Sequence, residues 1–227
     1  MAKVFEKLFL IRLYPILDPL IPSHQFGFRS SHSTIQQCHR IVDTISSSLE
    51  RKEYCSGVFL DVAQAFDRVW HRGLLSKLKN ILPSTYYLIL SSYLSERYFS
   101  VSYGSATSPS YPQLAGVPQG GILSPILFII YTADMPTHPA TSLFGFADDT
   151  AILTSSPNPF LASQAIQEHL GLLEPWLSKW RFKVNPDKSS HVTFSLHYSS
   201  CLPVGINSQP IPENPKLLTS VSYSTKD

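Results

Sequence analysis

The sequence predicts an α+β fold in which an antiparallel sheet of the ferredoxin-like, split βαβ type carries its helices on one face. Two observations support this prediction. Short, mostly apolar segments at residues 56–61 and 143–153 have the character of buried strands, and helical patterns separate them. The order over residues 56–196 is strand, helices, hairpin, helix and strand. In such a sheet the end of the first strand can lie beside the tip of the central hairpin.

The N-terminal part is predicted to be helical. Residues 3–17 place Val4, Leu8 and Ile11 on one face of a helix. Ser33 followed by Gln36 is a candidate capping box. It opens a second helix whose apolar positions recur at alternating spacings of three and four, namely Ile35, Cys38, Val42, Ile45 and Leu49.

The central part reads as helices, one strand and a glycine-rich loop. Helices are expected over residues 69–82 and 84–94, the first of them stopped by a proline. Residues 97–103 alternate as a strand does, and residues 116–121 form a loop. A strongly apolar helix is expected to follow from Pro125.

The C-terminal part contains one long helix. Asn158 before Pro159 is a favourable helix start, because asparagine caps the N-terminus and proline suits the first turn. Pro175 is expected to kink or restart this helix. Residues 182–194 then predict two short strands on either side of a turn at 185–187.

The composition indicates a globular, intracellular chain. Of the 227 residues 43% are hydrophobic and 15% charged, and the formal net charge is +2. This weak positive charge would not by itself suggest a nucleic-acid partner. Cys38, Cys55 and Cys201 show no metal-binding spacing, and their odd number suits a reducing compartment. The longest apolar run, around residues 125–131, is too short to span a membrane.

Three aspartates are the strongest chemical signal. Phe146-Ala147-Asp148-Asp149 places two adjacent acids between apolar segments, and Asp61 ends an earlier apolar segment. A solvated turn is the simpler interpretation of the pair alone, since aspartates favour turns. The third acid in a matching apolar frame favours a cation site, because Mg²⁺ binds one or two carboxylates together with substrate phosphates.

Four segments in this order resemble motifs A, B, C and D of reverse transcriptases, and they lie at residues 57–67, 116–125, 146–149 and 183–188. Residues 25–29, Gln-Phe-Gly-Phe-Arg, followed by Ser33-Thr34, resemble a motif of the fingers. The set is most similar to the polymerases of non-LTR retrotransposons of the jockey type.

The resemblance implies a right-hand polymerase with fingers and palm but no thumb, truncated at both ends. Residues 1–55 would be partial fingers, and residues 56–198 would be the palm with an inserted fingers segment at about 84–115. Residues 199–227 would be a truncated, weakly ordered tail. The implied activity is RNA-directed DNA synthesis from deoxynucleoside triphosphates on an RNA template with a DNA primer, with nuclear action.

The resemblance also implies a catalytic centre. Asp61, Asp148 and Asp149, with a backbone oxygen near Val62, would hold two Mg²⁺ ions, for which Mn²⁺ can substitute. Lys188 matches a lysine that is a candidate acid for the departing pyrophosphate.

Further positions would contact the substrates. Phe66 matches a steric gate that leaves no room for a ribose 2′-hydroxyl. Gln119 and Gly120 would lie near the incoming nucleotide and the template, and Asp67 is expected to be structural. Arg29 would face the triphosphate or the template backbone, with a helix-cap or surface role equally open.

Three alternatives stand beside a polymerase. The chain could be a catalytically silent remnant of a retroelement, or a nucleic-acid-binding module that reuses the palm. A two-metal nuclease has less support, because Phe66 and the Pro118-Gln119-Gly120 loop have no purpose there.

Overall fold

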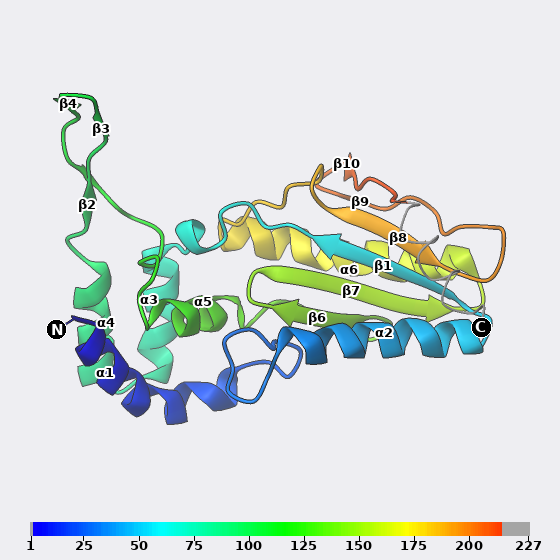
Figure 1. The fold of residues 1–227 in the computed structure, drawn as a ribbon, viewed down its shortest axis with the longest axis horizontal. Helices are drawn as coiled ribbons and strands as arrows, with labels where there is room; N and C mark the ends of the chain where they lie inside the picture. The colour runs from blue at the N-terminus through cyan, green and yellow to red at the C-terminus, as the bar shows by residue number, and fades with distance from the viewer. Residues whose placement is uncertain (1, 215–227) are drawn as a thin grey trace. The chain divides into compact units, whose positions relative to one another are not determined.

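The computed structural model describes residues 2–214 (Figure 1). The chain forms two compact units. Unit 1 consists of Met1–Pro22 and Gln64–Asp134. Unit 2 consists of Ser23–Ala63 and the chain from Met135 onward. Each unit is therefore assembled from two stretches that are separated in sequence. The part of the predicted tail at residues 215–227 lies outside the described residues.

Unit 2 is built on a four-stranded antiparallel sheet with the order β6-β7-β1-β8. Its strands are β1 (Tyr54–Leu60), β6 (Ser142–Phe146), β7 (Asp149–Ser156) and β8 (Ser190–Phe194). The first strand lies beside the central hairpin β6–β7, as the sequence pattern predicts. The two-residue strands β9 (Gly205–Ile206) and β10 (Gln209–Pro210) form a separate hairpin.

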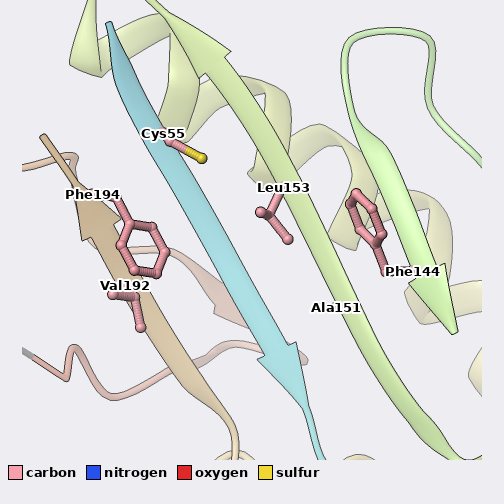
Figure 2. Close-up of a cluster of buried hydrophobic side chains, with 6 residues drawn as sticks. All are labelled: Cys55, Phe144, Ala151, Leu153, Val192 and Phe194. Atoms are coloured by element: carbon pink, nitrogen blue, oxygen red, sulfur yellow. The ribbon is translucent and has the colours of Figure 1, made fainter. Parts of the chain in front are cut away.

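Helices cover both faces of this sheet, so the predicted placement of helices on one face is wrong. Helix α2 (Thr34–Glu50) packs on the face that carries Cys55, Phe144, Ala151, Leu153, Val192 and Phe194. Figure 2 shows these side chains in front of the sheet and a helix behind it. Helix α6 (Pro159–Lys179) lies on the opposite face, where Ala162 packs with Tyr54 and Cys201. Successive side chains of β1 point to opposite faces of the sheet, so Tyr54 packs on one face and Cys55 on the other.

Helix α2 is capped as predicted, and its predicted apolar face is confirmed only at Ile45 and Leu49. Ser33 and Gln36 form the capping box with reciprocal hydrogen bonds. The residues that pack on the sheet are Ile41, Ile45 and Leu49. Ile35 and Val42, which were expected on the apolar face, are 69% and 54% exposed.

The chain around α6 corrects one further expectation and narrows another. Asn158 caps the helix through a bond from the Phe160 N–H, as predicted. The helix then continues through Pro175 to Lys179 without restarting. Of the two strands predicted in residues 182–194, only β8 forms, and the earlier segment contributes a single bridge between Val184 and Val62.

Unit 1 is mainly helical. Its elements are α1 (Ala2–Leu17), η1 (Asp18–Leu20), η2 (Phe66–Arg68), α3 (His71–Ile81), α4 (Ser84–Leu94), β2 (Tyr98–Phe99), β3 (Ser102–Tyr103), β4 (Ala106–Thr107), β5 (Tyr111–Pro112) and α5 (Ser124–Thr132). The strand predicted over residues 97–103 is divided between β2 and β3, which pair with β5 and β4 in exposed two-stranded ladders. Within residues 2–214 no helix is both long and apolar enough to cross a bilayer.

Helix α1 buries the face opposite to the predicted one. Val4, Leu8 and Ile11 are each about 60% exposed, whereas the buried positions are Glu6, Phe9, Leu13 and Leu17. Glu6 is buried because its carboxylate accepts hydrogen bonds from the N–H groups of Ile122 and Leu123 at 2.7 and 3.2 Å. These donors lie at the start of α5, where a helix has unpaired N–H groups.

Candidate active site

The register of β1 and β7 brings acids from two distant segments to one end of the sheet. Leu60, the last residue of β1, pairs with Thr150. Asp61 follows Leu60 and Asp149 precedes Thr150, so continuing the antiparallel register places Asp61 beside Asp149. Asp148 is the neighbour of Asp149 in the chain, so the same end of the sheet carries all three acids, and the expected approach of Asp61 to Asp148 stays a prediction.

Asp148 and Asp149 are presented by a very short turn. Phe146 pairs with Asp149, which leaves only Ala147 and Asp148 between β6 and β7. Ala147 has a φ of +58°. This left-handed conformation is energetically unfavourable for any residue that has a Cβ. Asp148 is half-buried and Asp149 is exposed.

The three carboxylates influence one another. Desolvation raises the pKa of Asp149, and the negative charges of Asp148 and Asp61 raise it further. Like charges at short range disfavour the ionised form. A bound cation would relieve this repulsion.

The donor set suits a cation that is only partly enclosed by protein. Among residues 2–214 no group of three or more His, Cys, Asp or Glu side chains, the three aspartates included, forms a cage that could hold a metal ion. Mg²⁺ differs from ions that need such a cage, because it keeps water and uses substrate phosphates beside one or two carboxylates. Asp61, Asp148 and Asp149 offer hard oxygen donors, which is the type of ligand that Mg²⁺ takes.

A loop at residues 183–189 holds the backbone around Asp61. The Asp61 N–H donates to Ser189 Oγ at 3.1 Å, and the Asp61 carbonyl accepts from the Asn185 N–H at 2.9 Å. The Ala63 N–H donates to the Lys183 carbonyl at 2.9 Å. The last two hydrogen bonds use the Asp61 carbonyl and the Ala63 N–H, which lie on either side of Val62, and they do not use the Val62 carbonyl. The exposed Lys188 belongs to the same loop.

The predicted substrate residues of unit 1 lie on two segments that contact each other. The ring of Phe66 stacks on Phe128 with centroids 4.5 Å apart, and the Phe66 carbonyl accepts from the Val117 N–H at 3.1 Å. The exposed Gln119 donates through Nε2 to Asp67 Oδ1 at 3.1 Å. The structure thus gives Asp67 a bond that orients Gln119.

Gly120 and Arg29 complete the predicted set. Gly120 has a φ of +78°, and among the described residues no atom lies within 4 Å of the position that a Cβ would take. Arg29 belongs to unit 2, and its Nη1 lies 3.4 Å from the carbonyl of Gln25.

Sequence reasoning missed Gln25 and Ser189. Gln25 bonds to Ala147 beside the acids, and Ser189 accepts from the N–H of Asp61. Gln25 lies in the segment that resembles a fingers motif, and Ser189 directly follows the segment that resembles motif D, but the resemblance assigns roles there only to Arg29 and Lys188.

Comparison with known proteins identifies the family. The family model for "Reverse transcriptase (RNA-dependent DNA polymerase)" matches residues 1–216. The chain therefore belongs to the reverse transcriptase family.

Its curated relatives narrow the group to polymerases of non-LTR retrotransposons. The chain is 42% identical over 221 residues to the RNA-directed DNA polymerase from mobile element jockey of Drosophila melanogaster. It is 41% identical over 220 residues to the probable RNA-directed DNA polymerase from transposon X-element of the same species. Each match covers 93% of this chain and 24% of the relative, so the chain spans about a quarter of the length of these relatives.

Solved structures show the same fold at low identity. An apo telomerase from Candida tropicalis, truncated from its C-terminal domain, superposes with a TM-score of 0.62 and 16% identity, covering 85% of this chain and 41% of the telomerase. A telomerase of that species in complex with a fragment of telomeric RNA superposes with a TM-score of 0.63 and 15% identity, covering 87% of this chain and 35% of the telomerase.

Proposed function

We propose that the chain carries the catalytic centre of an RNA-directed DNA polymerase, in which Asp61, Asp148 and Asp149 hold two Mg²⁺ ions for nucleotidyl transfer. The observation that carries this proposal is the register of β1 and β7, which brings acids 88 residues apart in sequence to one end of the sheet. Membership of the reverse transcriptase family supports it. The sheet of unit 2 would then be the polymerase palm.

The chain's own residues would hold and orient the reacting groups. When bound, Mg²⁺ supplies electrostatic stabilisation of the attacking and leaving oxygens. Asp61 and Asp148 would hold the ions, with Asp149 and the carbonyl of Val62 as further oxygen donors. The bonds from Ser189 and Asn185 keep the Asp61 backbone fixed. Lys188 would donate a proton to the departing pyrophosphate.

Unit 1 would supply selectivity for the sugar and contacts to the base pair. The stack on Phe128 restricts the ring of Phe66, so that a rigid aromatic group can exclude a 2′-hydroxyl. Gln119, oriented by Asp67, and the accessible backbone of Gly120 would contact the nucleotide and template. In unit 2, Arg29 would bind phosphate.

The proposed partners are an RNA template, a DNA primer and deoxynucleoside triphosphates, with action in the nucleus. The names of the curated relatives support the template and the reaction. One of the similar solved structures is a telomerase bound to a fragment of telomeric RNA.

Primer extension tests the proposal. The folded chain, given a primed RNA template, deoxynucleotides and Mg²⁺, should extend the primer, and Asp148→Ala should reduce extension to background. Asp43→Ala is the matched control, because Asp43 is an exposed acid on α2 and outside the proposed site. Absence of extension by the folded wild-type chain, or undiminished extension by Asp148→Ala, contradicts the proposal.

A further inference from the structure

The segment at residues 24–27 forms an additional edge beside β6. The Phe26 N–H donates to the Gly145 carbonyl, and the Gly145 N–H donates to the His24 carbonyl, both at 2.9 Å. Gln25 and Gly145 form a parallel bridge. The backbone of this segment is therefore fixed next to the strand that leads into the Asp148-Asp149 turn.

The side chain of Gln25 binds that turn directly. Its Nε2 donates to the Ala147 carbonyl at 3.0 Å, and its Oε1 accepts from the Ala147 N–H at 3.0 Å. Oε1 also accepts from the Gly27 N–H at 2.8 Å. Gln25 is only 7% exposed, so these bonds have little competition from water. The amide thus pairs with both backbone groups of one residue, as a neighbouring strand would.

Ala147 is the residue of the turn that most needs such support. Its φ of +58° costs a residue with a Cβ about 1–2 kcal/mol. A strained conformation persists only where the surroundings fix it. Gly27 adds a second constraint, since a Cβ at Gly27 would lie 2.1 Å from the Ala147 nitrogen. The segment can approach the turn this closely only because residue 27 is glycine.

We infer that Gln25 is a positioning residue of the active site. Its amide fixes the backbone of Ala147, and the backbone of Ala147 sets the direction in which Asp148 and Asp149 leave the turn. The role of the two aspartates toward a metal rests on the function proposed above. The hydrogen bonds to Ala147 themselves do not depend on that function.

Gln37 offers a matched control. It is also a buried glutamine, 4% exposed, and its Nε2 donates to the carbonyls of His24 and Gly145 at 2.9 Å. It therefore makes two bonds to the same edge of the sheet but none of them to Ala147. Loss of general support for the hairpin should be similar in Gln25→Ala and Gln37→Ala, whereas loss of the turn should be specific to Gln25→Ala.

The test uses four variants of the chain, which are Gln25→Ala, Gln37→Ala, Ala147→Gly and the double variant Gln25→Ala/Ala147→Gly. Hydrogen exchange of the Ala147 amide reports the turn, and Mn²⁺ binding followed by electron paramagnetic resonance reports the carboxylates. Gln25→Ala should accelerate exchange at Ala147 and weaken Mn²⁺ binding about tenfold or more, as expected for a residue that orients metal ligands. In the Ala147→Gly background the same substitution should have a smaller effect, because glycine adopts the positive φ without penalty.

The outcomes separate this inference from the proposed function. Unchanged exchange at Ala147 in folded Gln25→Ala overturns the inference, and so does an equal loss of Mn²⁺ affinity in Gln37→Ala. If the wild-type chain binds no Mn²⁺, or if Asp148→Ala binds it as well as the wild type does, the proposed function fails. Exchange at Ala147 then still decides whether Gln25 holds the turn.

Discussion

Glu6 should be among the most sensitive positions of unit 1 to substitution. Its carboxylate is buried and accepts two backbone N–H bonds at the start of α5, with the Tyr93 hydroxyl 3.4 Å from the same oxygen. The N-cap of α5 is Leu123, which has no side-chain acceptor. Glu6 therefore fixes the backbone at the N-cap of α5 and at the residue before it. The loop that carries Gln119 and Gly120 leads directly into this helix start.

The expected loss of stability follows from these contacts. A hydrogen bond to a charged group contributes about 1.5–3 kcal/mol. A partly buried charge at a helix terminus contributes up to about 2 kcal/mol, which overlaps with the first figure. Glu6→Ala removes two such bonds and should therefore lower the free energy of unfolding by about 3–6 kcal/mol. Glu6→Gln keeps an acceptor but loses the charge, and should cost about 1–2 kcal/mol.

Urea unfolding measures these losses, and the titration of Tyr93 provides a second readout. Burial raises the pKa of Tyr93, and the negative charge of Glu6 raises it further. Glu6→Gln should lower the pKa of Tyr93 while burial keeps it above its ordinary value. Glu96→Gln is the control, because Glu96 is an exposed acid of the same unit. A Glu6→Ala chain as stable as the control, or an unchanged Tyr93 titration in Glu6→Gln, would refute the reasoning.

Three further predictions concern the sugar gate, the support of Asp61 and acid stability. Phe66→Val should raise incorporation of ribonucleotides relative to deoxynucleotides in primer extension, because a smaller side chain admits the 2′-hydroxyl, and unchanged selectivity would count against a gate. Ser189→Ala should lower the free energy of unfolding by about 1–3 kcal/mol in urea, since it leaves the Asp61 N–H without its acceptor, and a neutral result would show that another acceptor replaces it. Burial, then the charges of Arg40 and His169, lower the pKa of His24 from 6.5 to about 4. Between these values the unfolded chain binds the proton and the folded chain does not, so stability should fall as the pH drops from 6.5 to 4. His24→Gln should flatten this fall in urea midpoints measured across the window, and an equally steep fall would exclude His24 as a cause.

The sequence predicted the features that depend on local pattern. The apolar run before Asp61 and the apolar segments around Asp148-Asp149 identify strands by short-range signals. The order of strands and helices along the chain then predicts that the first strand lies beside the central hairpin. The capping box at Ser33 and the cap at Asn158 are also local, and both are confirmed. The assignment of substrate and metal roles to individual residues stays a prediction.

The failures come from contacts that no local pattern contains. Glu6 faces inward because it accepts hydrogen bonds from Ile122 and Leu123. These partners lie more than a hundred residues away in the sequence, so no local pattern contains them. Helix α2 rests on Ile41, Ile45 and Leu49, which leaves Ile35 exposed despite its apolar spacing.

Pro175 lies inside one continuous helix. A proline removes one helical hydrogen bond and normally bends a helix. Leu173 and Leu177 on either side of it are both buried, and their burial holds the two halves of α6 in one helix. The sequence leaves a kink and a restart open at Pro175, and the structure excludes the restart.

The central position of β1 has a consequence for synthesis of the chain. Leu60 pairs with Thr150, 90 residues later, and Phe59 pairs with Ser190, 131 residues later. At about 5–20 residues per second, β1 leaves the ribosome roughly 5–20 s before its first partner strand. During that interval it is an apolar strand with two open edges, the state in which strands associate with the wrong chain. The strand that leads into Asp61 is thus made early and paired late, and a nascent chain is most exposed to aggregation until residues 190–194 have emerged.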